Sequence, residues 1–109
     1  MIVSDQMVQD AFDWLHNHAE SAASAKAEKI RAEYGVKATR ARLFKEFEGT
    51  VAERQAWADC DMTTQEAYER EALAVETDEF HRVNRSKCEA IIEAWRTEQA
   101  NLRGMGKVG

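Results

Sequence analysis

The 109-residue sequence has no proline, only five glycines, only two cysteines and no long apolar run. Because proline interrupts helices, its absence from a chain that is 32% charged favours long helices. No stretch approaches the roughly 18 apolar residues that span a bilayer, so we expect no membrane segment. The first residues carry neither a basic region nor an apolar core, so we expect no signal peptide. Two cysteines are too few for a disulfide framework, which favours a reducing cytoplasm.

Weak helix formers and glycines mark the expected helix boundaries. The run His16-Asn17-His18 predicts a joint between a short helix and a long one. Gly49 predicts the end of the long helix, and the glycines from Gly104 onward predict a flexible tail. The sequence thus predicts one helical domain. Its elements are helices 5–16, 19–48, 51–59 and 64–102 and a tail at 103–109.

Capping residues support three of the helix starts. Ser4 can accept a hydrogen bond from the first turn of the first helix. Thr50 and Glu53 have the spacing of a capping box, in which each side chain bonds the other residue's backbone N–H. Thr63 or Thr64 is the expected cap of the last helix.

Apolar residues recur three and four positions apart in both long helices, which is typical of a packing seam. Gly35 lies within the first seam and marks a close crossing or a bend. At 1.5 Å per residue the last helix would be roughly 58 Å long, more than the diameter of a compact domain of this size. The sequence therefore predicts an all-α, elongated antiparallel helical hairpin or coiled coil with two additional short helices. The expected seam residues are Ile30, Tyr34, Ala38, Ala41, Phe44 and Phe47 or Glu48 in the first long helix, and Tyr68, Ala72, Val75, Phe80, Val83, Cys88, Ile91 or Ile92, Trp95 and Leu102 in the second.

The net charge of −5 is segregated along the chain. Residues 1–25 sum to −4, residues 26–45 to +5, residues 46–80 to −9 and residues 81–109 to +3. In an antiparallel hairpin these blocks bring opposite signs together, so we interpret the segregation as control of register. The competing interpretation is a nucleic-acid-binding stripe in the second block. The candidate stripe consists of Lys37, Arg40, Arg42 and Lys45, preceded by Lys26, Lys29 and Arg31.

No residues are spaced for a metal, cofactor or catalytic site. Cys60, His81 and Cys88 lack the paired spacing of structural zinc ligands. Neither a glycine-rich phosphate loop nor a nucleophile with a histidine base is recognisable. We therefore expect no enzyme activity, no cofactor and no metal.

Several segments together carry a resemblance to small helical proteins that tailed bacteriophages and prophages encode. The similarity covers most of residues 19–107, and relatives of this kind are often encoded near recombination and replication genes. The segments are Ala27-Glu28-x-x-x-Ala32-Glu33-Tyr34, then Gly49-Thr50-Val51-Ala52-Glu53-Arg54 with Ala58, and finally Ile91-Ile92-Glu93-Ala94-Trp95-Arg96-Thr97 with Asn101, Arg103, Met105, Gly106 and Lys107.

The resemblance implies a context and not a reaction, because no chemical mechanism attaches to these motifs. We expect a non-enzymatic phage accessory protein of DNA recombination or replication. It would act in the host cytoplasm through contacts with a DNA-processing protein, with single-stranded DNA as a second kind of target, and would form a homo-oligomer. The alternative is a phage inhibitor of a host defence or nuclease complex that presents an acidic helical surface. The candidate interaction surface consists of Trp95, Arg96, Asn101, Arg103 and Lys107.

Overall fold

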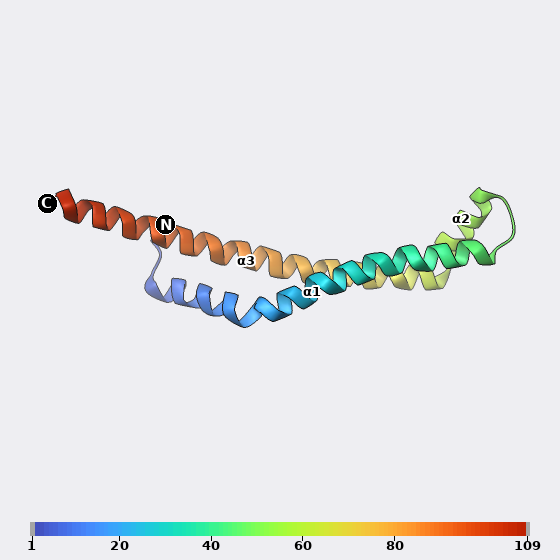
Figure 1. Ribbon diagram of the computed structural model, residues 1–109, viewed down its shortest axis with the longest axis horizontal. Helices are drawn as coiled ribbons and strands as arrows, with labels where there is room; N and C mark the ends of the chain where they lie inside the picture. The colour runs from blue at the N-terminus through green and yellow to red at the C-terminus, as the bar shows by residue number, and fades with distance from the viewer. Residues whose placement is uncertain (1, 109) are drawn as a thin grey trace. The chain divides into compact units, whose positions relative to one another are not determined.

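The computed structural model describes residues 2–108, with side chains for residues 2–106. The chain is all-α, as predicted, and contains three helices within this range (Figure 1). Their bounds are Asp5–Glu46 for α1, Val51–Cys60 for α2 and Met62–Val108 for α3. The chain divides into two compact units: unit 1 combines Met1–Ala22 with Phe80–Gly109, and unit 2 is Ala23–Glu79.

Unit 1 pairs the first part of α1 with the last part of α3 in antiparallel orientation. Its core consists of Ala11, Cys88 and Ile92, with Trp14, Leu15 and Ile91 packed around it, so the predicted seam is correct at Cys88 and Ile92. At the start of the chain, the backbone N–H of Val3 donates to both carboxylate oxygens of Glu98, at 3.2 and 3.1 Å. The predicted cap at Ser4 is confirmed, because its Oγ accepts the Met7 N–H at 3.1 Å.

The expected joint at residues 16–18 is wrong, because α1 is continuous through it. The imidazole ring of His18 stacks on the Trp14 ring, with centroids 4.3 Å apart. Its Nδ1 also donates to the Trp14 carbonyl oxygen at 2.9 Å. These contacts between residues four apart hold the turn in a helical conformation and offset the weak helix propensity of the segment.

Unit 2 pairs the rest of α1 with the first part of α3, again antiparallel. Lys29 Nζ lies 3.6 Å from Asp78 Oδ2, an ion pair of opposite charge blocks as the hairpin interpretation requires. The buried residues on the facing sides are small or medium in size, which lets the two helices approach closely. They are Ala25, Val36 and Leu43 in α1 and Thr64, Ala67 and Ala74 in α3.

The predicted seam of α1 is wrong in unit 2. Ile30 is 59% exposed and Tyr34 is 71% exposed, and both lie roughly 140° to 180° around the helix from Ala25 and Leu43. A Cβ at Gly35 would meet nothing within 4 Å, so this glycine marks no close crossing with α3. The exposed residues among the predicted seam of α3 are Tyr68, Ala72, Phe80, Val83 and Leu102.

The start of α2 is predicted correctly. Thr50 Oγ1 accepts the Glu53 N–H at 3.2 Å, and Glu53 Oε1 accepts the Thr50 N–H at 3.4 Å, which completes the capping box. The start of α3 is not where it was expected. Asp61 Oδ2 accepts the Thr63 N–H at 2.9 Å, so an aspartate caps this helix and neither threonine does.

Arg54 closes the end of α1, where Gly49 was the expected stop. The helix ends at Glu46, and Gly49 does not take the positive φ of a glycine C-cap. Arg54 Nε donates to the carbonyl oxygens of Phe44 at 3.0 Å and Phe47 at 2.7 Å. A helix leaves its last carbonyl groups without intrahelical partners, and the bond to Phe44 satisfies one of them. The bond to Phe47 holds the residue that follows the helix.

Candidate functional site

The predicted interaction surface at the end of α3 is only partly available. Trp95 is half-buried, and its indole N–H donates to Asp5 Oδ1 at 3.4 Å, which anchors it against the start of α1. Arg96 Nη1 lies 3.8 Å from the Glu93 carboxylate on its own helix. Trp95 is therefore a structural contact of unit 1, whereas Arg96 remains on the surface with a screened partner.

From residue 100 to residue 106, every side chain of α3 is exposed. Asn101 and Arg103 lie on this stretch as predicted, whereas the side chain of Lys107 lies outside the described ones. Two apolar residues of this stretch were not part of the predicted surface. Leu102, which was expected in the packing seam, is 58% exposed, and Met105 is 71% exposed. Because these residues are three apart, they share one side of the helix.

The flexible tail predicted for residues 103–109 is wrong for residues 103–108, because α3 continues to Val108. A Cβ at Gly104 or Gly106 would meet nothing within 4 Å. Each glycine costs a helix interior about 1 kcal/mol relative to alanine. No contact of the described side chains offsets that cost, so this stretch of α3 is a helix without an intramolecular partner.

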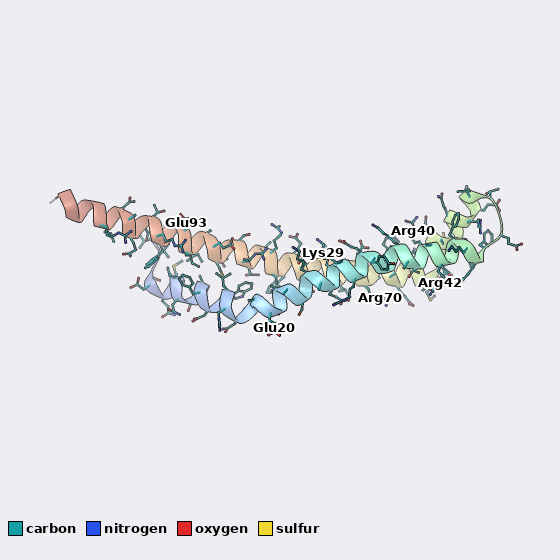
Figure 2. The ribbon with its side chains drawn as sticks, viewed as in Figure 1. Glu20, Lys29, Arg40, Arg42, Arg70 and Glu93 are labelled. Atoms are coloured by element: carbon teal, nitrogen blue, oxygen red, sulfur yellow. The ribbon has the colours of Figure 1, made fainter. Side chains whose placement is uncertain are left out.

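The candidate basic stripe does not form one surface. Arg40 Nε lies 2.8 Å from Asp59 Oδ1 of α2, while Arg42 pairs at 3.9 Å with a glutamate one turn further along α1. Figure 2 shows Arg40 and Arg42 leaving α1 toward opposite edges of unit 2. Lys37 and Lys45 are exposed and form no ion pair among the described side chains. The four cations therefore do not line one continuous stripe along α1.

An aromatic cluster lies at the connection between α1 and α2. The Phe47 and Trp57 rings stack with centroids 5.4 Å apart, and the Arg54 guanidinium lies 4.7 Å from the Phe44 ring centroid. Arg54 is thus held by both a cation–π contact and the carbonyl bonds described above. Its role follows from the fold of the connection, which no local sequence signal predicts.

Imidazole and aromatic rings also gather in unit 1. The His81 ring centroid lies 6.1 Å from those of Trp14 and His18, and 5.5 Å from that of Phe80. His81 Nδ1 is buried without a hydrogen-bond partner. Among the described residues, no three His, Cys, Asp or Glu side chains are placed to hold a metal ion.

The two cysteines have different environments. Cys60 is exposed at the end of α2, and Cys88 is buried in the core of unit 1. Burial raises the pKa of the Cys88 thiol, opposed by the positive charge of Lys87 and reinforced by the negative charge of Glu89. Cys88 is therefore a neutral, apolar core residue at neutral pH.

Two shallow hollows lie next to each other along one side of unit 2, with volumes of about 230 and 280 Å³. Glu28 and Arg70 line both, and the Glu28 carboxylate lies 3.4 Å from the Arg31 guanidinium. No histidine or cysteine lines either hollow, so their walls offer neither a thiol nucleophile nor an imidazole base. The remaining lining residues are Ala32, Gly35, Thr39 and Ala67 in the first hollow and Ala25, Leu73, Ala74 and Thr77 in the second.

Within residues 2–108, none of the helices has the length and apolar character needed to cross a membrane. The chain matches no protein-family model, no curated protein and no solved structure.

Proposed function

We propose that the chain is a non-catalytic accessory protein of phage DNA recombination or replication, acting in the host cytoplasm by binding a DNA-processing protein. The DNA context rests on the resemblance of its sequence segments to small phage-encoded helical proteins. The binding role rests on one observation above all, the unpartnered end of α3. Every described side chain of residues 100–106 is exposed there, including Leu102 and Met105.

The geometry of this end favours a helix that binds in a groove. The Val3–Glu98 and Asp5–Trp95 hydrogen bonds hold α3 at the point where its contacts with the start of the chain end. The following turns project a preformed helix, so binding costs less conformational entropy than the folding of a disordered tail.

The chemistry of this helix indicates the chemistry of its partner. Leu102 and Met105 share one side, while Arg96 and Arg103, seven residues apart, share another. An apolar groove with an acidic rim complements both sides. Because the rim charges are exposed, they would set orientation and association rate more than affinity.

The test is affinity capture with the full-length chain from phage-infected cells, read by mass spectrometry. We expect a protein of DNA recombination or replication to be captured by the unmodified chain and lost with the double variant Leu102→Asp, Met105→Asp. The matched control is Val51→Asp, which makes the same change at an exposed position of α2. Capture that survives the double variant, or that yields no DNA-processing protein, would contradict the proposal.

The acidic α3 segment of unit 2 supports a second candidate, an inhibitor that covers a basic surface of a host defence or nuclease complex. Residues 62–79 contain six acidic residues and one arginine, and the exposed Glu69 and Glu76 form no ion pair among the described side chains. The double variant Glu69→Gln, Glu76→Gln would then abolish inhibition of a host nuclease, whereas the α3-end variants would not. The opposite pattern supports the first candidate.

A further inference from the structure

The outer side of α1 in unit 2 is a second apolar stripe that nothing in the unit covers. Ile30 and Tyr34 lie opposite the buried residues Ala25, Val36 and Leu43 of the same helix. They are the largest side chains on the outer side. Lys26, Lys37 and Lys45 flank them, are exposed and form no ion pair among the described side chains. We call this surface the basic face. Its exposed members are Ala23, Lys26, Ile30, Tyr34, Lys37, Ala41 and Lys45.

The outer side of α3 in the same unit has the opposite charge. Met62 is 74% exposed and Leu73 is 63% exposed, and both point more than roughly 100° away from the buried Ala67. Glu69 and Glu76 lie between and beside them. We call this surface the acidic face, made of Met62, Glu69, Ala72, Leu73 and Glu76.

Residues 23–46 carry seven Lys or Arg against three Glu, a net charge of +4. Residues 62–79 carry six Asp or Glu against one Arg, a net charge of −5. The Lys29–Asp78 pair on the inner side accounts for one charge of each helix, so most of the complementary charge lies elsewhere on the two helices. The chain thus presents two exposed faces that complement each other in charge and that both carry apolar side chains.

We infer that the basic face of one copy of this chain binds the acidic face of a second copy, in a head-to-tail contact. The opposite arrangement, in which like faces meet across a two-fold axis, would bring lysines against lysines or glutamates against glutamates. A head-to-tail contact uses different surfaces on the two copies, so it can add further copies and does not stop at a dimer. The contact lies in unit 2 and does not depend on the partner proposed for the end of α3.

The exposed surface of the single chain agrees with this contact. The chain exposes 8203 Å², whereas a monomeric globular protein of its mass exposes about 6,100 Å². A specific interface buries about 800 Å² on each partner. Two such contacts per copy, one on each face, would remove about 1,600 Å², which lies within the excess.

The test uses two full-length variants, each of which disables one face. The variant Ile30→Glu, Tyr34→Glu turns the basic face acidic, and the variant Glu69→Lys, Leu73→Lys turns the acidic face basic. Circular dichroism first checks that both keep the helical content of the unmodified chain. Val51→Glu is the control, because it adds a glutamate at an exposed apolar position outside both faces.

Sedimentation velocity over a range of concentrations gives the decisive result. We expect the unmodified chain and the control to grow in mass with concentration, and each double variant alone to associate at least about tenfold more weakly. An equimolar mixture of the two variants should form a one-to-one complex that stops at two chains, because each variant retains the face that the other has lost. Raising the salt concentration should weaken both the native assembly and the mixed complex.

Three results would overturn the inference. The first is that the unmodified chain stays monomeric at every concentration. This result counts against the inference even if the basic face binds single-stranded DNA. The second is self-association that either double variant retains in full. The third is loss of association in both variants without recovery on mixing, which indicates a two-fold contact through like surfaces.

Discussion

Replacing Gly35 with alanine should stabilise the protein. Gly35 lies in the interior of α1, eleven residues before its end at Glu46. An added Cβ would point into the first hollow and meet nothing within 4 Å, and no glycine among the described residues has a positive φ. The change therefore introduces neither a clash nor backbone strain.

The expected gain follows from helix propensity alone. Alanine is favoured over glycine in a helix interior by about 0.8 to 1.0 kcal/mol, because glycine loses more backbone freedom on folding. For a chain of this size, a change of 1 kcal/mol corresponds to an increase in Tm of about 4 °C.

Urea and thermal unfolding followed by circular dichroism at 222 nm measures the gain, because this signal reports helix in both units. The matched control is Gly49→Ala. There the added Cβ would lie 3.1 Å from Phe47 Cε1 and 3.4 Å from Glu53 Cβ, so the clash offsets the loss of chain entropy. We expect an increase in the free energy of unfolding for Gly35→Ala and none for Gly49→Ala.

A loss of stability in Gly35→Ala would refute the reasoning. It would mean that the hollow beside Gly35 is filled by a closely packed segment in the functional protein. The hollow beside Gly35, and not the basic face, would then be the contact surface of unit 2. The added alanine methyl group would have no room in such a packed interface and would destabilise it.

Four further predictions concern the core, the cap and the two thiols. Ile92→Ala should lower the free energy of unfolding by about 3 kcal/mol, measured by urea titration, because Ile92 fills the core of unit 1; a loss below 1 kcal/mol would contradict this placement. Thr50→Ala should cost about 1 kcal/mol in the same assay while Thr50→Ser restores the native value, because serine keeps the oxygen that accepts the Glu53 N–H. A maleimide reagent should modify Cys60 rapidly and Cys88 only after unfolding. Because the pKa of Cys88 is raised in the folded state, the thiol contributes fully to the free energy of unfolding below the pKa of the unfolded state. That contribution is lost as the pH rises through the folded-state pKa. Cys88→Ala should therefore remove this decrease in stability at alkaline pH.

The local features of this protein were predictable because they depend on neighbouring residues. The Ser4 cap, the Thr50–Glu53 capping box and the helical class all follow from contacts within one turn of chain. The break expected at residues 16–18 failed because propensity is a weak signal. One ring stack and one hydrogen bond between Trp14 and His18 hold the turn in a helix.

Which side of α1 is buried depends on the tertiary structure. α1 carries two apolar stripes with helical spacing, and the sequence alone favours the larger side chains of Ile30 and Tyr34. The fold instead buries Ala25, Val36 and Leu43. Small residues on α3 let α1 approach closely on that side. The packing energy is gained along the whole paired length of the two helices, so it outweighs the burial of one large side chain.

Which residues form the exposed surfaces also depends on the tertiary structure. Whether Arg40 and Arg42 form one stripe depends on where α2 places Asp59, which no spacing within α1 reveals. The charge blocks and the all-α class were properties of the sequence by itself. Which charges face inward, and which remain exposed for a partner, depends on the rotation of each helix about its own axis, and that rotation is fixed only when the helices pack.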